Sequence, residues 1–311
     1  MYHDFTYQDV LASSLRAQWQ IDDVLRADQE LDFSRNMLPD SLARTANLSV
    51  LSPDERRTLN QISANQYLYM FGVVEEFILP FVLDHARPML SDADDYRVRA
   101  LLNFAGEEAK HVHLFKRFHA AFARGFPVEC AMIGPREMLG RTVLAHHPLA
   151  VGLAILMIEW MTQDHYLGSI RDDGDIDPLF KSLLKFHWME EAQHAKLDTL
   201  IVDALAEDLG ESEIDRVMGD YFAICAFLDT SLGHQARLNV EALERAIGRS
   251  IDGRHRLINQ QHQAARWTYL GSGMTHRNFR ATLESISPRA AERVASVVTQ
   301  VTAQAARLAA A

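Results

Sequence analysis

Two copies of the motif Glu-x-x-His constrain this chain more than any other feature of its sequence. The first copy holds Glu108 and His111, and the second holds Glu191 and His194. Residues at positions i and i+3 lie on one face of an α-helix, so both side chains of a copy can reach the same metal ion. The motifs therefore predict two helices that turn these faces toward a common interior.

One further glutamate precedes each copy at the same distance in sequence. Glu76 lies 32 residues before Glu108 in the apolar segment FGVVEEFILPF, and Glu159 lies 32 residues before Glu191 in LAILMIEWM. The chain thus contains a weak internal repeat of one helix with a glutamate, a turn, and one helix with Glu-x-x-His. Glu75 is the neighbouring alternative to Glu76, and the repeat favours Glu76.

The glutamates that lie inside apolar helix faces need a positive partner if they are to stay ionised. A buried carboxylate is costly unless it is paired or bound to a metal ion. Four helices with inward carboxylates, two of which carry Glu-x-x-His, are the layout of ferritin-like di-metal bundles. Four carboxylates balance two divalent cations, and oxygen and imidazole ligands together suit iron or manganese. We therefore expect two Fe ions, with Mn or a mixed Mn/Fe pair as alternatives.

The apolar pattern outside the motifs is helical throughout. Apolar residues recur at three- and four-residue steps, and Gly and Pro number only 15 and 9 in 311 residues. No alternating strand pattern with hairpin turns is present. Helices are predicted over residues 7–30, 61–83, 97–123, 150–169, 178–209, 211–232, 234–249 and 288–310. The predicted fold class is all-α, one domain over residues 1–311: a ferritin-like helical bundle with a four-helix metal-binding core at about 61–200 and extra N- and C-terminal helices.

A third histidine breaks the symmetry of the repeat. His187 precedes Glu191 by four residues and His194 by seven, so all three lie on one helix face. The equivalent residue of the first repeat is Phe104. His187 either adds an imidazole to one metal or is a core histidine bonded to a carbonyl, and the spacing alone leaves both interpretations open.

The complete order of these residues resembles that of a known family. Glu, then Glu-x-x-His, then Glu, then His-x-x-x-Glu-x-x-His is similar to the p-aminobenzoate N-oxygenase family of di-iron oxygenases, over about residues 61–200. The resemblance implies that seven residues ligate the metals and form the catalytic centre, namely Glu76, Glu108, His111, Glu159, His187, Glu191 and His194.

The resemblance also implies an activity and partners. The family is one of non-haem di-iron monooxygenases that use O2 and an external electron donor to convert an aryl amine to a hydroxylamine, nitroso or nitro product. It implies a small-molecule amine substrate, a reductant or electron-donor protein, a homodimer and a role in specialised biosynthesis. A carrier protein that presents the amine is a further option.

Other residues near the motifs are weaker candidates. Glu107 and Glu190 directly precede the motif glutamates, where many di-iron enzymes have an Asp that bonds a ligand histidine across the site. The longer side chain leaves that role open. Residues three or four positions from predicted ligands are candidates for lining a pocket, namely Val73, Phe104, Leu156 and Gln163.

The composition of the chain excludes some classes of partner and favours one cellular location. The formal net charge is −11, from 31 Lys and Arg against 42 Asp and Glu, which argues against nucleic-acid or anionic-membrane binding. Two cysteines cannot build a disulfide framework, so a reducing, cytoplasmic location is expected. The longest apolar run, residues 149–158, is about half of what a membrane span requires.

Three other functions fit parts of the pattern. A di-iron oxygenase that acts on carbon, such as a hydroxylase or desaturase, would use the same ligands. A ferritin-like iron-handling protein would also bind the metals, although storage subunits are usually shorter. The third is a structural bundle without metal.

Overall fold

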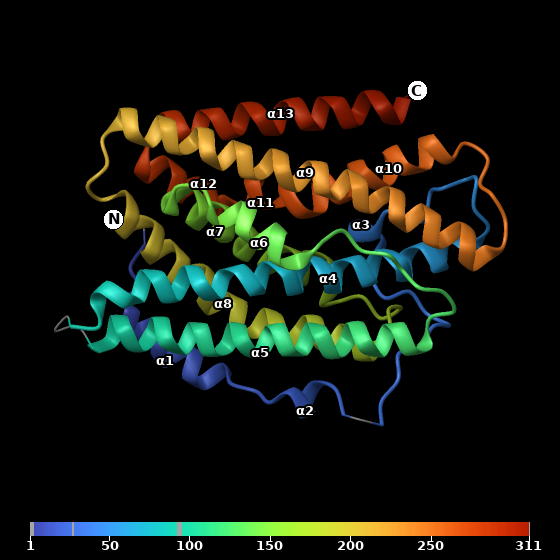
Figure 1. Cartoon of the computed structure of the whole chain (residues 1–311), viewed down its shortest axis with the longest axis horizontal. Coiled ribbons are helices and arrows are strands. Elements are labelled where there is room, and N and C mark those ends of the chain that lie inside the picture. The colour runs from blue at the N-terminus through green and yellow to red at the C-terminus, as the bar shows by residue number, and fades with distance from the viewer. Residues whose placement is uncertain (1–2, 27, 92–94, 311) are drawn as a thin grey trace.

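Four long helices form the core, and they are the helices that carry the predicted motifs (Figure 1). They are α4 (Pro53–Ala86), α5 (Asp95–Gly125), α7 (Pro148–His165) and α8 (Pro178–Ala206). The computed structural model describes residues 3–26, 28–91 and 95–310, with the backbone alone at 95 and 303–310. These described residues contain no β-strand, only an isolated bridge between Asn36 and Ile176. The predicted all-α bundle is confirmed.

The core helices pack in two pairs, with further helices around them. α4 lies along α5, and α7 lies along α8. α9 (Glu211–Ile247) packs against both α4 and α7, while α1 (Tyr7–Ala17) lies against α5 and α8. In Figure 1, α13 (Pro288–Ala310) forms the outer layer beyond α9, on the opposite side of the bundle from α1. The predicted additional N- and C-terminal helices are therefore present.

Local sequence signals explain where α4 begins. Ser52 accepts a hydrogen bond from the Glu55 amide at 3.3 Å, and the Glu55 carboxylate accepts one from the Ser52 amide at 2.8 Å. This reciprocal capping box, followed by Pro53 at the first helical position, fixes the helix start. Pro80 lies inside the helix without ending it.

The apolar length of α4 reflects its burial in the core. Residues Pro53–Met89, which are α4 and the short helix η1 (Arg87–Met89), are the one helical stretch of the described chain long and apolar enough to cross a membrane. In its most apolar window 78% is buried inside the fold. Core helices of soluble proteins pass the same test, so this length is weak evidence for a span.

The structure differs from the predicted helices in several places. The helix predicted over 7–30 is divided into α1 and α2 (Ile21–Val24), whereas 211–232 and 234–249 form the single helix α9. Gly233 lies inside α9 and does not end it. The absence of a side chain at this position leaves room for the His262 ring, which lies 3.0 Å from where a Cβ would be. The helices that the apolar pattern missed are α3 (Asp40–Ala43), α6 (Arg136–Leu144), α10 (Arg254–Arg266), α11 (Ser272–Thr275) and α12 (Arg277–Ile286).

Two π-helical turns interrupt the regular helices. η2 (Tyr166–Ile170) follows α7 directly, and η3 (Trp267–Gly271) joins α10 to α11. Such turns are rare and often occur at functional sites. The segment after η3 lies so close to α7 that a Cβ on Gly273 would be 2.6 Å from the Met157 carbonyl oxygen. Gly273 therefore sets the distance between α11 and the helix that carries Glu159.

We expect Gly273→Ala to destabilise the fold by about 1–3 kcal/mol, because the added methyl group meets backbone that cannot yield locally. Gly219→Ala is the matched control. Gly219 lies inside α9 with no atom within 4 Å of the added carbon, so this change should be neutral or stabilise by about 0.5–1 kcal/mol. Thermal unfolding of both variants measures the difference. Equal melting temperatures would contradict the close approach of α11 to α7.

Candidate metal centre

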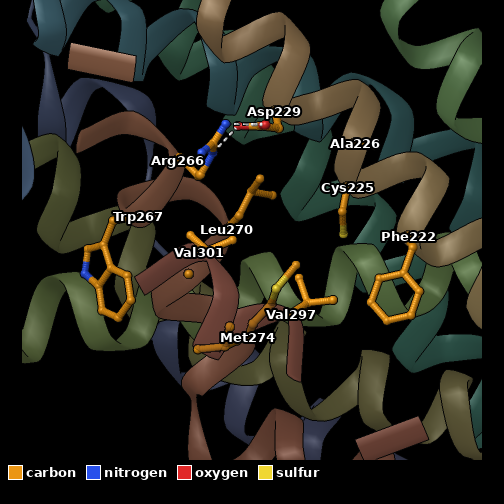
Figure 2. A pocket seen from close by; sticks show the side chains of 12 residues that line it. Phe222, Cys225, Ala226, Asp229, Arg266, Trp267, Leu270, Met274, Val297 and Val301 are labelled. Carbon is orange, nitrogen blue, oxygen red and sulfur yellow. Dashed lines mark hydrogen bonds and ion pairs between the residues drawn. The ribbon is translucent and has the colours of Figure 1, made fainter. Parts of the chain in front are cut away.

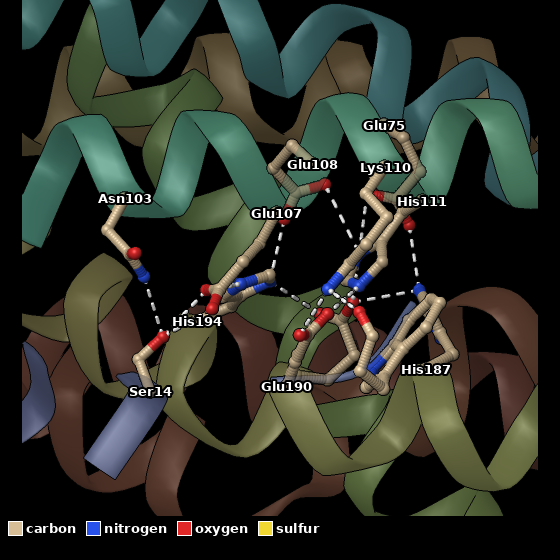
Figure 3. Close-up of polar contacts among 12 residues, drawn as sticks. Ser14, Glu75, Asn103, Glu107, Glu108, Lys110, His111, His187, Glu190 and His194 are labelled. Atoms are coloured by element: carbon tan, nitrogen blue, oxygen red, sulfur yellow. Dashed lines mark hydrogen bonds and ion pairs between the residues drawn. The ribbon is translucent and has the colours of Figure 1, made fainter. Parts of the chain in front are cut away.

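Seven acidic and histidine side chains from the four core helices meet in one buried cluster. Figure 3 shows Glu75, Glu108, His111, His187 and His194 of this cluster. α4 supplies Glu75, α5 supplies Glu108 and His111, α7 supplies Glu159, and α8 supplies His187, Glu191 and His194. All seven are at most 2% exposed. Six of the residues predicted from the sequence are thus brought together.

The exception is Glu76, and its prediction as a ligand is wrong. Its side chain is 28% exposed and forms ion pairs with Lys116 at 2.7 Å and Arg136 at 2.9 Å. Partial burial raises the pKa of Glu76, but the hydrogen bonds from Arg136 and Lys116 more than offset this and lower it. Glu75 takes the inward position, because neighbouring helical residues differ by about 100° in direction and only one can face the centre.

The donor atoms form two overlapping groups. One group is Glu75, His111, His187 and Glu191, and the other is Glu108, His111, Glu191 and His194. In each group the ligand atoms lie within 4.8 Å of one another. An imidazole nitrogen has one lone pair and serves one metal, whereas the two oxygens of a carboxylate can serve two. The shared Glu191 is therefore suited to bridge a pair of ions.

The hydrogen bonding of the cluster is incomplete in a way that fits metal ions. Buried polar atoms are normally hydrogen-bonded, so each exception needs an explanation. In the cluster, the atoms without a hydrogen bond of acceptable geometry all carry lone pairs, namely Glu75 Oε2, both oxygens of Glu108, His111 Nδ1, Glu159 Oε2, Glu191 Oε1 and His194 Nδ1. Several of them are nevertheless crowded together, since His194 Nδ1 lies 2.7 Å from Glu108 Oε1 and His111 Nδ1 lies 3.0 Å from Glu191 Oε1. Oxygen and imidazole nitrogen are the donor set that divalent iron and manganese prefer.

Two glutamates hold the histidines from the opposite helix. His111 Nε2 of α5 lies 2.8 Å from Glu190 Oε2 of α8, and His194 Nε2 of α8 lies 3.0 Å from Glu107 Oε2 of α5. A carboxylate at Nε2 keeps the proton there and leaves the Nδ1 lone pair facing the centre. Glu107 and Glu190 thus make the cross-site contacts that their position suggested, despite the longer side chain.

The segment around Trp19 completes the surroundings of Glu190. The Lys110 ammonium pairs with Glu190 Oε1, and it also donates to the Trp19 carbonyl at 3.1 Å. The same ammonium lies 4.0 Å from the centre of the Trp19 ring, which stacks on His111 at 5.9 Å. These contacts join positions about 90 residues apart in the chain, and no short-range sequence pattern predicts them.

Glu107 is held by neutral groups from the N-terminal helix instead. The Ser14 hydroxyl of α1 lies 2.6 and 2.8 Å from the two oxygens of Glu107, and Asn103 donates to Ser14 at 2.8 Å (Figure 3). Burial raises the pKa of Glu107, but the bond and charge of His194 together with Ser14 lower it overall. Sequence reasoning missed Ser14 as well.

The pKa directions in the cluster show that its carboxylates repel one another. Burial and the repulsion of Glu108 raise the pKa of Glu75 well above its usual value, and burial with the repulsion of Glu191 does the same for Glu159. Burial also disfavours ionised Glu108, yet His194 and other partners lower its pKa to about 2. Four carboxylates cannot all stay ionised here unless cations join them.

Aromatic rings close the cluster from solvent. Phe71 and Phe115 meet the His187 ring edge-on at 5.6 and 4.9 Å, and Phe104 lies 4.4 Å from the His194 ring. His187 Nε2 itself lies 3.0 Å from Glu75 Oε1 and 2.8 Å from Glu191 Oε1. It therefore faces carboxylates of the cluster, and the alternative of a core histidine bonded to a carbonyl has no support here.

The remaining candidates lie in the core. Phe104 contacts the cluster as described, while Val73, Leu156 and Gln163 are buried, at 4%, 0% and 7% exposed. A role for them in a substrate pocket stays a prediction. Asp198, which the sequence analysis missed, lies one turn beyond His194 with both carboxylate oxygens buried and unpartnered. Burial raises its pKa well above the usual value.

The fold and this donor set define a class, the di-metal carboxylate proteins built on a ferritin-like helical bundle. The family model for p-aminobenzoate N-oxygenase AurF matches residues 12–242. The chain belongs to this family. Its cofactor is a di-metal centre and its activity is that of an O2-dependent oxygenase.

Solved structures provide a weaker comparison. Two R2-like ligand-binding oxidase mutants, one with an Fe/Fe and one with a Mn/Fe cofactor, are 14% and 12% identical to the chain with TM-scores of 0.43 and 0.46. The alignments cover 85% and 89% of this chain and 93% of each oxidase. These values are too low to transfer a metal, substrate or reaction. No curated protein sequence matches the chain.

A pair of neighbouring substitutions tests the corrected ligand set. Glu75→Gln should remove a charged ligand and reduce the bound metal from about two ions per chain, the number that four carboxylates neutralise, to about one or fewer. Glu76→Gln should retain both ions because Glu76 bonds Lys116 and Arg136. Metal analysis after anaerobic loading with Fe(II) measures both. Loss of metal in Glu76→Gln alone would restore the original prediction.

The cross-site carboxylates give a second prediction. Glu190→Ala should weaken metal binding by about 10–100-fold, because His111 loses the acceptor that fixes its tautomer. Glu190→Gln should lose less metal affinity, since its amide oxygen can still accept a hydrogen bond from His111 Nε2. Competition with a chelator gives the affinities, and Glu137→Ala, an exposed glutamate of α6, is the control. Equal affinities for all three variants would rule out a role of Glu190 at the metal.

Proposed function

We propose that the protein is an O2-dependent N-oxygenase that converts an aryl amine to its hydroxylamine and onward to nitroso or nitro products. The family match supports this reaction, and the position of His187 is the observation that carries it. A third imidazole directed at Glu75 and Glu191 distinguishes this centre from the symmetric arrangement of two Glu-x-x-His motifs. We infer that Glu75, Glu108, His111, Glu159, His187, Glu191 and His194 hold the two metal ions.

The reaction needs electrons from outside the protein. One step joins an amine R–NH2, O2, two electrons and two protons to give R–NHOH and water. The metal pair, when bound, supplies the activation of O2 and accepts the electrons from an external reductant. We therefore include a reductant or electron-donor protein among the partners. A homodimer, a carrier protein that presents the amine, a cytoplasmic location and a role in specialised biosynthesis remain parts of this proposal.

The residues of this chain have separate tasks in the proposed reaction. Glu107 and Glu190 keep the protons of His194 and His111 on Nε2, so that both imidazoles stay directed at the metals. Phe71, Phe104 and Phe115 surround the histidines and exclude bulk water, which limits loss of the oxidant by side reactions.

His187→Ala tests the assignment of the third imidazole. The variant should keep its helical content but lose at least about 100-fold in the rate of N-oxidation, the size of effect typical for a group that acts directly at the reacting centre. The reaction is started by adding 18O2 and a reductant to the Fe(II)-loaded protein with a panel of aryl amines. Mass spectrometry then counts the oxygen atoms that reach the amine nitrogen.

His113→Ala is the matched control, because His113 is an exposed histidine of α5. It should retain full activity. If the 18O label is found on carbon instead of nitrogen, the protein is a hydroxylase. If His187→Ala retains full activity, His187 is a core residue and not a metal ligand.

A further inference from the structure

We propose that the amine oxidised at this centre is uncharged and carries an apolar substituent, which occupies a cavity between α9, η3 and α13. This proposal rests on the proposed N-oxygenation and specifies which class of amine the protein oxidises. It predicts that p-aminobenzoate itself, which carries a carboxylate, is a poor ligand of this chain.

The cavity has the size and lining of a small-molecule site. Its volume is about 320 Å³, within the range of ligand pockets. Side chains from α9, α10, η3, α11 and α13 line it (Figure 2). Most of the lining is apolar, including Phe222, Leu270, Met274, Val297, Val298 and Val301. Cys225 also lines the cavity, and burial raises the pKa of its thiol to about 12, so this group too is neutral.

The charged residues of the lining neutralise each other. Arg266 donates from Nε to Asp229 Oδ1 at 2.6 Å and from its terminal nitrogen to Oδ2 at 2.7 Å (Figure 2). His262 Nε2 also lies 2.9 Å from Asp229 Oδ1. The guanidinium is thus committed to a carboxylate of the protein, and the lining offers no other cation to a carboxylate of a ligand.

A second, smaller gap lies between this cavity and the core helices α4 and α7. Its volume is about 20 Å³, room for one water molecule, and Leu270 lines both spaces. Its wall includes Val74 and Ile158, the residues directly before Glu75 and Glu159. Phe71, which meets the His187 ring edge-on, is also part of the wall. The wall of this gap is therefore one residue away from the cluster on α4 and α7, and we infer that the substituent reaches the outer cavity along it.

The chemistry of the inner gap excludes a charged ligand. Its wall is apolar apart from the phenol of Tyr269, whose pKa burial raises, so that the group stays neutral. Met70 and Met161 line the same wall, and their flexible side chains can move to admit an aromatic ring. A carboxylate that entered would lose its hydration without gaining a partner. An alkyl chain, in contrast, gains roughly fourfold in affinity for each buried methylene.

The test compares ligand binding without turnover. Fe(II)-loaded protein is titrated by calorimetry under anaerobic conditions with 4-butylaniline, aniline and 4-aminobenzoate. We expect 4-butylaniline to bind at least about 100-fold more tightly than either of the other two, from the methylene gain and the cost of burying an unpaired carboxylate. Equal or tighter binding of 4-aminobenzoate would overturn the proposal.

A matched pair of variants locates the substituent. Ala226 and Ala223 are exposed alanines of α9, but only Ala226 lines the cavity. Ala226→Trp should fill the cavity and weaken binding of 4-butylaniline by at least about tenfold, since about two buried methylenes suffice for such a loss. Ala223→Trp should bind like the unmodified protein. Equal affinities of the two variants would show that the substituent lies elsewhere.

Subsequent addition of O2 and a reductant separates this inference from the proposed function. If 4-butylaniline binds as expected but is oxidised on carbon, the cavity assignment holds and N-oxygenation fails. If an anionic aryl amine binds more tightly and is N-oxidised, the proposed function holds and the substrate class is wrong.

Discussion

The structure depends on the burial of four carboxylates whose ion-pair partners among the described residues are histidines and not lysine or arginine. Glu75, Glu108, Glu159 and Glu191 come from four different helices and meet within one cluster. Burial and their mutual repulsion raise the pKa of Glu75 and Glu159 well above the usual value, which disfavours the ionised form of both. Two divalent ions would remove this repulsion and satisfy the unpartnered donor atoms together. The same ions would connect the pair α4 and α5 to the pair α7 and α8.

The helices are also joined around the cluster by contacts that need no metal. Each motif histidine is bonded by a glutamate from the other motif helix, so α5 and α8 fix each other's imidazoles. The N-terminal segment adds Ser14 and Trp19 on the outer side of these glutamates. These contacts fix the orientation of the imidazoles independently of the metal ions, which would lower the reorganisation required for binding.

The sequence predicts the parts of this arrangement that follow from local periodicity. Glu-x-x-His at helical spacing identified two ligand pairs, and apolar periodicity identified the four core helices. It could not choose between Glu75 and Glu76, because that choice depends on the rotation of α4 about its axis and on Lys116 and Arg136 beside it. α10 was missed because few of its residues are apolar, and α12 because it has only ten residues. α9 was divided because a glycine such as Gly233 often marks a helix end, and the packing of His262 against it is a long-range contact.

The two halves of the centre are chemically unequal, and the inequality goes beyond His187. The carboxylate behind His111 faces the ammonium of Lys110, whereas the carboxylate behind His194 receives only the neutral hydroxyl of Ser14. A carboxylate that keeps more of its negative charge makes the bonded imidazole a stronger electron donor. His194 therefore has the less neutralised carboxylate partner of the two motif histidines, while His187 adds its nitrogen beside Glu75. The residues of this centre would therefore give the two metal ions different surroundings, although the two Glu-x-x-His motifs form a symmetric repeat in the sequence.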